Sequence, residues 1–319
     1  MSFCDEIREA AAAVAARARS VRIDADSLAM FADVFEYEKP TAPDYDLAHH
    51  HRASEGSTLA FIVTLDTINF GSGYWPVLRK RPGLSGYMTV ATSLKERFDS
   101  SGPWSASELV GIEAREVAEC LGQDASHPEI GELVGRFARA LRDLGGWLTT
   151  RFGGRFEGLV EESAGSAERM ATLLSEMPFY HDVHRYGGLL VPLFKRAQIV
   201  PADLALAFAG EGPGRFSDLD RLTIFADNLV PHVLRRRGVL RYSSALAETI
   251  ERGELLLVGS GEEVEIRAVA LHAVELLVAD LRARGLTTSA REIDQILWVQ
   301  GQDPAVKRHP RHRCRSVYY

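Results

Sequence analysis

A long succession of helical patterns constrains the fold of this chain more than any other feature. From Met88 onward, apolar residues recur with the spacing of one helix face, and Gly or Pro interrupts each stretch. The expected helices span residues 105–121, 128–149, 164–176, 193–210, 219–236, 243–252, 264–285 and 289–300. Ser105-Ala-Ser-Glu108 has the capping-box pattern, in which the Ser hydroxyl and the Glu carboxylate bond the first amides of a helix. The pattern predicts a mainly α protein.

The N-terminal third is more varied. Residues from Cys4 to about Ala32 have helical periodicity. The segment Thr58–Phe70 is apolar almost throughout, so we expect it to be buried, as either a strand or a helix. Gly71 to Gly86 is rich in Gly and Pro, and we expect a small β-hairpin there, with Val77-Leu-Arg-Lys-Arg81 as one strand.

The composition is that of one globular protein. The chain has 319 residues, of which 46% are hydrophobic and 25% are charged. No internal repeat of fixed period stands out in the sequence, and no segment is of low complexity. We therefore expect a single domain over residues 1–319, with 1–150 and 151–319 as sub-halves packed around one active-site cleft.

Charge and cysteine content argue against several classes of function. The formal net charge is −7, whereas proteins that bind long DNA or RNA usually carry a basic surplus that neutralises phosphates. The three cysteines form no CxxC pair, which argues against a disulfide framework and a structural zinc site. The N-terminus lacks an apolar signal core, and the apolar runs are too short to cross a bilayer. We expect a cytoplasmic protein without a polynucleotide or membrane partner.

Polar residues inside apolar runs are the candidates for chemistry, because burying them costs free energy unless a partner compensates. Asp66 and Asn69 lie in Thr58–Phe70, Asp227 lies in a second apolar run, and Lys195 is near the start of an apolar helix. Each could simply cap a helix or bond buried backbone, as most buried polar groups do. Their order along the chain supports a more specific hypothesis.

The order of Lys195, Gly212-Pro-Gly214 and Phe225-Ala-Asp227 resembles the helix-hairpin-helix DNA glycosylases, in which a catalytic aspartate follows a lysine-bearing helix. The gap between Lys195 and Asp227 is longer than in those enzymes, and the Gly-Pro-Gly turn follows the lysine helix instead of preceding it. The resemblance implies a DNA-glycosylase-like helical fold and chemistry at an N-glycosidic bond, without binding of a DNA duplex.

A resemblance to the queuosine salvage proteins covers essentially the whole chain. Seven short motifs stand in that family's order and spacing: Thr64-Leu-Asp-Thr-Ile-Asn-Phe70, Ser85-Gly-Tyr87, Phe152-Gly-Gly154, Phe194-Lys-Arg-Ala-Gln-Ile199, Phe225-Ala-Asp227 with Pro231, Glu263-Val-Glu-Ile-Arg267 and Arg315-Ser-Val-Tyr-Tyr319. Each motif is common in isolation, but the ordered set is specific. The resemblance implies a hydrolase that cleaves the N-glycosidic bond of queuosine 5′-monophosphate, a small-molecule nucleotide, and releases queuine for salvage into tRNA. Hydrolysis requires no cofactor and no metal.

The resemblance assigns the catalytic roles to Asp227 and Lys195. Breaking the C1′–N9 bond builds positive charge on the ribose, which a buried carboxylate at position 227 could stabilise while it polarises the attacking water. Lys195 could keep Asp227 ionised or contact the 5′-phosphate. A Schiff-base lyase reaction through the lysine ranks below simple hydrolysis, because cleavage of a free nucleotide requires no strand scission.

Substrate contacts follow from the chemistry of the nucleotide. An acidic side chain and an amide can read the Watson–Crick donors of the 7-deazaguanine base, aromatic rings can stack on it, and cations can bind the phosphate. The candidates are Asp66, Asn69, Phe70 and Tyr87 for the base; His49, His50 and Asp303 for the cyclopentenediol; Arg313, Arg315, His232 and Arg196 for the phosphate; and Tyr318 and Tyr319, with Arg313 and Arg315, for closing the pocket. The run of three histidines is interpreted as a loop, not as a metal site.

Two other classes of function remain open on the sequence. A base-excision DNA glycosylase would use the same chemistry but would require a basic face, against which the net charge argues. A non-catalytic helical protein that binds queuine or its nucleotide would leave the glycosidic bond intact, with Asp227 and Lys195 as a structural ion pair. A nucleoside phosphorylase is disfavoured, because those enzymes have an α/β architecture.

Overall fold

The computed structural model describes residues 2–38 and 43–319. Helices predominate and the strands form only two-stranded pairs, which confirms the predicted mainly α fold class. The residues group into two compact units, each assembled from separate chain segments. Unit 1 comprises Met1–Pro43, Asp182–Lys195 and Asp218–Arg315, and unit 2 comprises Asp44–His181, Arg196–Ser217 and Ser316–Tyr319. Each unit therefore draws on both sides of residue 150.

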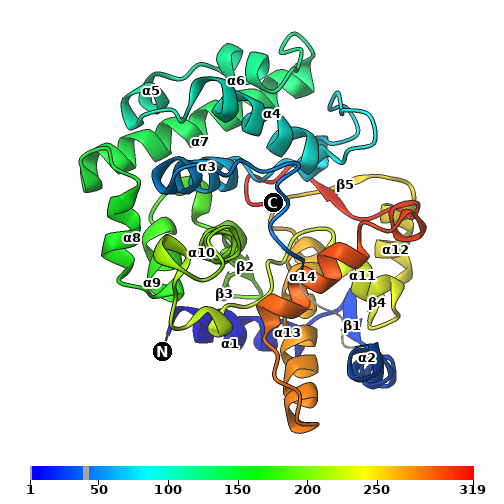
Figure 1. The fold of residues 1–319 in the computed structure, drawn as a ribbon. Coiled ribbons are helices and arrows are strands. Elements are labelled where there is room, and N and C mark those ends of the chain that lie inside the picture. The colour runs from blue at the N-terminus through cyan, green and yellow to red at the C-terminus, as the bar shows by residue number, and fades with distance from the viewer. Residues whose placement is uncertain (1, 39–42) are drawn as a thin grey trace. The chain divides into compact units, whose positions relative to one another are not determined.

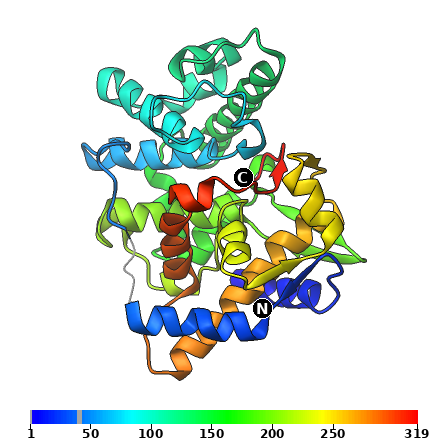
Figure 2. The ribbon, with the colours of Figure 1, turned by 90° about the vertical axis from the view of Figure 1, so that its right-hand side faces the viewer.

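Unit 1 is built around helix α13 (Gly261–Ala283), which is buried along most of its length. Helices α1 and α2 and strand β1 pack against α13, and Figure 2 shows α2 in blue beside α13 in orange. The other helices of unit 1 are α1 (Phe3–Ala15), α2 (Ala25–Glu38), η4 (Leu219–Arg221), α11 (Val230–Arg236), α12 (Ser244–Glu251), α14 (Ala290–Gln300) and α15 (Pro304–Lys307). Its strands are β1 (Val21–Ile23), antiparallel to β4 (Leu240–Tyr242); β2 (Val183–Tyr186), antiparallel to β3 (Leu189–Pro192); and β5 (Leu255–Leu256), parallel to β6 (Arg313–Cys314).

Unit 2 is organised by the long helix α7 (Pro128–Phe152), against which α3, α5, α6 and α8 pack (Figure 1). Gly145 of α7 allows the closest approach, because a Cβ there would lie 2.7 Å from the Ala106 carbonyl oxygen of α5. The other helices of unit 2 are α3 (Glu55–Thr67), η1 (Ser72–Tyr74), α4 (Gly86–Ser101), α5 (Ala106–Gly111), α6 (Ala114–Cys120), α8 (Glu157–Ser163), α9 (Ala167–Leu174), η2 (Pro178–Tyr180), α10 (Lys195–Ala207), whose first residue belongs to unit 1, and η3 (Gly212–Gly214).

The small hairpin lies in the middle of the chain, not in the N-terminal third. β2 and β3 are joined by Gly187 and Gly188, both with positive φ, as the type I′ turn of a two-residue hairpin requires. In the predicted location, Gly71 to Gly86, the structure has a 3-10 helix and turns. The expected strand residue Arg79 bonds a side chain there, because its N–H donates to Gln123 and its carbonyl accepts from the same amide.

Two predicted helices are interrupted. The stretch from Cys4 to Ala32 is broken by β1, whose pairing with β4 overrides the local helical preference. The stretch 219–236 forms a regular α-helix only from Val230, with Pro231 in its first turn, where a missing N–H costs nothing. The preceding residues 222–229 are irregular, and their backbone is bonded by side chains from other elements.

Other expectations of local structure are confirmed. The ambiguous segment Thr58–Phe70 is a helix through Thr67, and ten consecutive residues of α3 are buried, which explains its lack of a polar face. The capping box forms, since Glu108 N–H donates to Ser105 Oγ and Ser105 N–H donates to Glu108 Oε2. The expected helix 105–121 divides into α5 and α6 at Ile112 and Glu113.

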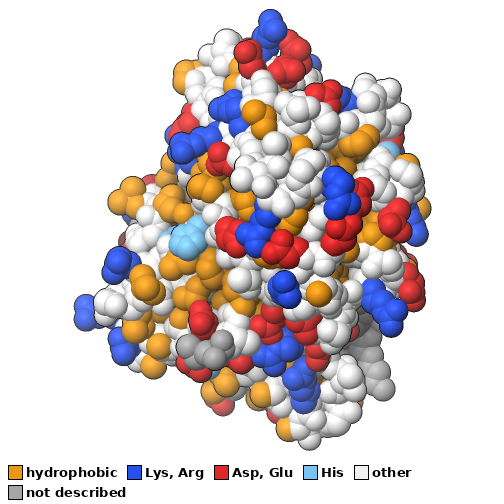
Figure 3. All heavy atoms as spheres, turned by 90° about the vertical axis from the view of Figure 1, so that its left-hand side faces the viewer, with side chains coloured by type: hydrophobic (Ala, Val, Ile, Leu, Met, Phe, Trp, Pro, Cys, Tyr) orange, Lys and Arg blue, Asp and Glu red, His pale blue; other side chains and the backbone are white. Residues whose placement is uncertain are grey.

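The lengths of the helices and the distribution of surface charge bear on the possible partners of the protein. No helix among the described residues is both long enough and apolar enough to span a bilayer. On the face drawn in Figure 3, basic and acidic side chains of the described residues are interspersed with apolar ones. Many of the exposed arginines are paired with carboxylates, as in Arg81–Glu96 and Arg155–Glu161.

Candidate active site

Asp227 lies between the irregular buried segment and helix α11. Its Oδ1 accepts the backbone N–H groups of Leu229 at 2.7 Å and Val230 at 3.1 Å, so the carboxylate is oriented by two charge-assisted bonds. The side chain is partly exposed, whereas both neighbouring residues are buried. Within the described part of the chain, Oδ2 accepts no hydrogen bond. One carboxylate oxygen is thus held by the protein, and the other remains available to a reactant.

The backbone on either side of Asp227 is anchored by buried side chains. Phe225 N–H donates to Asp294 Oδ1 at 2.8 Å, and the Ala226 carbonyl accepts from Arg267 Nε at 2.8 Å. Asn228 Nδ2 donates to the His312 carbonyl at 3.4 Å. These bonds replace the ladder of a regular helix or strand, as buried backbone groups require. They fix the position from which the Asp227 side chain projects.

Lys195 is the first residue of α10, and only 5% of it is exposed. Its backbone N–H donates to Asp182 Oδ2 at 3.2 Å. The preceding residue, Phe194, has φ +46°, a conformation that costs a non-glycine residue about 1–3 kcal/mol and is concentrated at functional sites. A buried lysine next to a strained backbone position has the features of a functional group, and not of a solvated surface charge.

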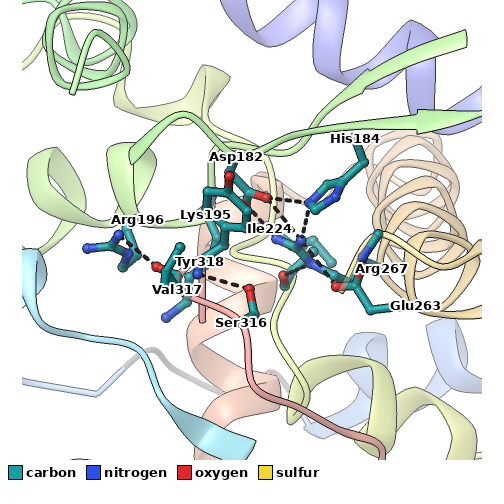
Figure 4. Close-up of polar contacts among 12 residues, drawn as sticks. Asp182, His184, Lys195, Arg196, Ile224, Glu263, Arg267, Ser316, Val317 and Tyr318 are labelled. Atoms are coloured by element: carbon teal, nitrogen blue, oxygen red, sulfur yellow. Dashed lines mark hydrogen bonds and ion pairs between the residues drawn. The ribbon is translucent and has the colours of Figure 1, made fainter. Parts of the chain in front are cut away.

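A cluster of buried charges surrounds the start of α10 (Figure 4). Arg267 donates to Asp182 from Nη1 at 3.0 Å and from Nη2 at 2.6 Å, and it also lies 3.4 Å from Glu263. His184 Nε2 lies 2.9 Å from Asp182 Oδ1. Burial opposes ionisation of Asp182, but the adjacent Arg267 guanidinium and His184 hold the pKa of its carboxyl well below the usual value. The cluster contains an ionised carboxylate at physiological pH.

The tail of unit 1 contributes a cation close to Asp227. Arg311 is partly buried and interacts electrostatically with Asp227; burial lowers its pKa and the carboxylate partly offsets this. Within the described residues, the Arg311 guanidinium makes no hydrogen bond or ion pair. Burial lowers the pKa of His232 to about 4 and that of His312 to about 3, so both rings are neutral at pH 7.

The other candidate residues of unit 1, one in α11 and three near the end of the unit, make contacts with other parts of the protein. His232 Nε2 bonds the Val306 carbonyl at 3.2 Å, and Arg313 donates to the Gly253 carbonyl at 3.2 Å. Arg315 is partly buried in the same tail, next to strand β6. Asp303 is exposed and caps α15, since its Oδ1 accepts the Ala305 N–H at 2.7 Å. These contacts place the four residues in unit 1 and leave their roles toward a substrate as predictions.

Unit 2 brings several predicted base-binding residues together. Asn69 Nδ2 donates to Asp66 Oδ1 at 3.3 Å, and Asp66 is completely buried. His50 Nε2 lies 2.9 Å from the Tyr87 hydroxyl. Burial, and next to it the charges of Asp203 and Asp66, raise the pKa of Tyr87. The half-buried Tyr87 phenol, the His50 imidazole and the carboxylates of Asp66 and Asp203 thus form a polar cluster within unit 2.

The histidine run does not act as one group. His49 bonds Thr92 at 2.9 Å, and His50 bonds Tyr87. His51 lies between Asp99 and Ser57, at 2.6 and 2.8 Å. Each ring therefore has its own partner. Within the described ranges, no group of three His, Cys, Asp or Glu residues is placed to hold a metal ion.

Phe70 and Arg196 belong to the core of unit 2. The Phe70 ring packs edge-to-face on Phe137 at 4.9 Å and is only 1% exposed. Arg196 is 1% exposed and donates to the backbone carbonyls of four residues: Asp66, Thr67, Phe179 and Val317. The guanidinium thus connects the end of α3 to the C-terminal segment, and Figure 4 shows its bond to Val317. This role differs from the phosphate contact expected from the sequence.

The C-terminal tyrosines are held in unit 2. Gly71 N–H donates to the Tyr319 carbonyl at 3.0 Å, and Tyr319 is 2% exposed. Tyr318 N–H donates to Ser316 Oγ at 3.0 Å. The last residues of the described chain therefore fold back onto the loop that follows α3, and their expected role in closing a pocket stays a prediction.

Sequence reasoning missed five residues that these clusters contain: Asp182, Asp203, Arg267, Asp294 and Arg311. Arg267 had a visible signal, because it and Glu265 are the only charged residues in the otherwise apolar stretch from Val264 to Leu271. Asp294 had no such signal, because it stands among other polar residues of α14. Asp182 stands in an ordinary polar stretch, and only its contacts identify it.

Comparisons with known proteins show which family the chain resembles. The family model described as "Queuosine salvage protein" matches residues 49–319. A Sphaerobacter thermophilus protein is 35% identical over 311 residues, which cover 96% of this chain and 95% of that protein. A Bos taurus protein is 31% identical over 98% of both chains, and a Dictyostelium discoideum protein is 31% identical over 86% of this chain and 83% of its own. All three relatives are named queuosine 5′-phosphate N-glycosylase/hydrolase.

Proposed function

Because the chain belongs to the queuosine salvage protein family, we propose that it hydrolyses the N-glycosidic bond of queuosine 5′-phosphate. Water adds to C1′ of the ribose, the C1′–N9 bond breaks, and its electron pair leaves with the base. The base takes up a proton as queuine, and the sugar leaves as ribose 5-phosphate. This reaction balances with water as the only co-reactant, so it needs no cofactor.

The observation that carries this proposal is the environment of Asp227. Two backbone N–H groups hold Oδ1, and Oδ2 accepts no bond within the described residues. A carboxylate whose orientation is fixed before the reaction stabilises developing positive charge without a reorganisation cost. Asp227 therefore stabilises the oxocarbenium-like ribose and orients the attacking water through Oδ2.

Lys195 supplies the second catalytic group. Its ammonium is largely shielded from water, so its electrostatic effect on nearby anions is stronger than it would be in solution. In this proposal Lys195 keeps the carboxylate of Asp227 ionised or binds the 5′-phosphate. Hydrolysis needs no Schiff base, and the lysine remains unmodified through the reaction.

Different residues are proposed to bind the base, the diol and the phosphate of the nucleotide. Asp66, Asn69 and Tyr87 accept or donate hydrogen bonds at the edge of the base. His49 and His50 form hydrogen bonds with the hydroxyl groups of the cyclopentenediol. Asp303 is the weaker diol candidate, because its carboxylate already caps α15. The anionic phosphate requires a cation: Arg313 and Arg315 are the candidates proposed from the sequence, and Arg311 joins them for its place beside Asp227. His232, neutral at pH 7, contributes at most a hydrogen bond.

The substrate is a small nucleotide and not a polynucleotide in this proposal. The net charge of −7 and the pairing of exposed arginines with carboxylates support this choice. We further propose a cytoplasmic location, since the queuine released is a precursor for tRNA.

Incubation of the purified protein with queuosine 5′-phosphate, followed by chromatography for queuine and ribose 5-phosphate, tests the proposal. Asp227→Asn is the informative variant, because its amide oxygen still accepts the Leu229 and Val230 N–H groups while the charge is lost. We expect a rate at least about 100-fold lower. Asp220→Asn, an exposed aspartate in η4, is the matched control and should behave as wild type.

The outcomes separate the two parts of the proposal. Binding of the nucleotide without release of queuine by the wild type would rule out the hydrolase and leave a binding protein. Equal rates for wild type and Asp227→Asn would keep the activity but assign the chemistry to another residue.

A further inference from the structure

One buried Arg–carboxylate pair, Arg267 and Asp182, bonds both segments that carry the candidate catalytic residues. Arg267 projects from α13 and is 0% exposed. Its Nη1 and Nη2 bond the two oxygens of Asp182 at 3.0 and 2.6 Å, which is the bidentate geometry of a strong Arg–carboxylate pair. Its remaining nitrogen, Nε, donates to the Ala226 carbonyl at 2.8 Å. Asp227 is the next residue along the chain.

The partner carboxylate is bonded to the lysine segment. Asp182 Oδ2 accepts the Lys195 N–H at 3.2 Å, and the Asp182 carbonyl accepts the N–H groups of Leu193 at 2.9 Å and Phe194 at 3.4 Å. Phe194 has its unfavourable positive φ within this set of bonds. Asp182 therefore bonds the first residue of α10 and the two residues that precede it, and Figure 4 shows Asp182 beside Lys195.

Stabilisation of the fold does not by itself explain why Asp182 and Arg267 form a buried ion pair. Removing two charges from water is costly, and a buried ion pair is often no more stabilising than apolar residues of the same volume. The directional bonds do something that apolar packing cannot, because they relate two backbone positions through one bidentate pair of planar groups, the Arg267 guanidinium and the Asp182 carboxylate. Those positions are the residue before Asp227 and the amide of Lys195.

We propose that Asp182 and Arg267 are positioning residues that hold Asp227 and Lys195 in a fixed relative geometry for glycosidic cleavage. This inference rests on the proposed function. In this inference both side chains, which are at least 98% buried, bond the segments that carry the catalytic residues and not the substrate. They act through the Ala226 carbonyl and the Lys195 amide, and the effect is on the rate of the chemical step, which a displacement of about 1 Å can lower by about 100-fold.

The test uses two conservative variants. Arg267→Lys keeps the positive charge but loses the bidentate contact and the bond to Ala226. Asp182→Asn keeps the shape but removes the charge that pairs with Arg267. Their single-turnover rates of queuine release, with enzyme in excess over queuosine 5′-phosphate, report bond cleavage separately from product release. All rates are measured below the melting temperature of each variant.

Glu265→Gln is the matched control. Glu265 lies two residues from Arg267 on α13, is 3% exposed, and accepts the backbone N–H groups of Arg19, Ser20 and Val21. Its loss weakens a buried polar network of unit 1 that has no bond to Lys195 or Ala226 among those described. The loss of stability in Glu265→Gln should therefore lower its melting temperature, but its cleavage rate should not fall.

We expect cleavage by Arg267→Lys and Asp182→Asn to be at least about 10-fold slower, with the rate of Glu265→Gln within about twofold of wild type. Wild-type cleavage rates in both site variants would overturn the positioning role. If one of these two site variants does not fold, the cleavage rate of the other one tests the positioning role. Equal slowing in Glu265→Gln would also overturn the role, since it would mark a general loss of rigidity. Absence of queuine from the wild type would instead refute the proposed function.

Discussion

Asp294 Oδ1 accepts the backbone N–H of Phe225 at 2.8 Å, and both residues are buried. This single bond joins helix α14 to the irregular segment that leads into Asp227. Asp294→Ala leaves a buried N–H without its acceptor, so we expect a loss of about 1–3 kcal/mol in the free energy of unfolding. Asp294→Asn retains an oxygen acceptor, so its free energy of unfolding should fall by less. Urea denaturation of the three proteins measures the difference, and equal loss in the two variants would show that the bond is unimportant.

The buried histidines predict loss of stability in acid. Burial lowers the pKa of His232 to about 4, whereas in the unfolded chain it is near 6.5. The unfolded state therefore binds the proton first, and the stability contributed by the neutral ring is complete above about pH 6.5 and is lost as pH falls toward 4. His312, with its pKa near 3, extends the loss to lower pH.

His232→Gln isolates this contribution, because the amide can still donate to the Val306 carbonyl but does not titrate. Urea unfolding at pH 7, 6, 5 and 4 should show a shallower loss of stability for the variant, by up to about 1.4 kcal/mol per pH unit. Identical pH profiles for wild type and variant would contradict the assigned burial of a neutral ring.

The hydroxyl of Tyr87 provides a test of base recognition in unit 2. Tyr87→Phe removes the group that bonds His50 and lies near the carboxylates of Asp66 and Asp203. If the cluster contacts the substrate, kcat/KM for queuosine 5′-phosphate should fall by about 10-fold or more, since a hydrogen bond to a buried polar group is worth about 1–3 kcal/mol.

Tyr180→Phe is the matched control for this variant. Tyr180 is a buried tyrosine of unit 2 whose hydroxyl bonds Thr67 at 3.0 Å, whereas Tyr87 is half-buried. Each variant loses one hydroxyl that bonds a neighbouring side chain, so both should lose stability. Only Tyr87→Phe should lose kcat/KM, and parallel losses in the two variants would indicate a structural role.

Arg311 provides a test of phosphate binding. Its guanidinium is partly buried, interacts with Asp227 and makes no hydrogen bond within the described residues. Arg311→Gln should raise KM for queuosine 5′-phosphate by about 10-fold or more, because charge-assisted bonds contribute about 1.5–3 kcal/mol. The effect with unphosphorylated queuosine should be smaller, because only the interaction of Arg311 with Asp227 is then lost. Arg308→Gln, an exposed arginine three residues earlier, is the control, and equal KM values for both variants would exclude Arg311 from the phosphate site.

Local sequence determined most of the helices and the identity of two candidate residues. Helices α7, α13 and α14 appear close to their expected limits, because apolar periodicity and capping residues act over a few positions of the same segment. Lys195 and Asp227 stood out since a charged residue in an apolar run requires compensation wherever the chain places it. The small hairpin was expected as an element of the fold but not at Gly187 and Gly188, where two positive φ angles allow the turn.

Tertiary structure alone decided how those candidates are held. The strand β1 exists only through its partner β4, more than 200 residues later, and this pairing outweighs a helical pattern. Asp182 and Arg267 meet across 85 residues of chain. A hydrogen bond depends on distance and angle in space, which composition and spacing along a chain do not contain. The sequence alone therefore singled out Lys195 and Asp227 as candidates, and only the fold showed which backbone positions Asp182 and Arg267 connect.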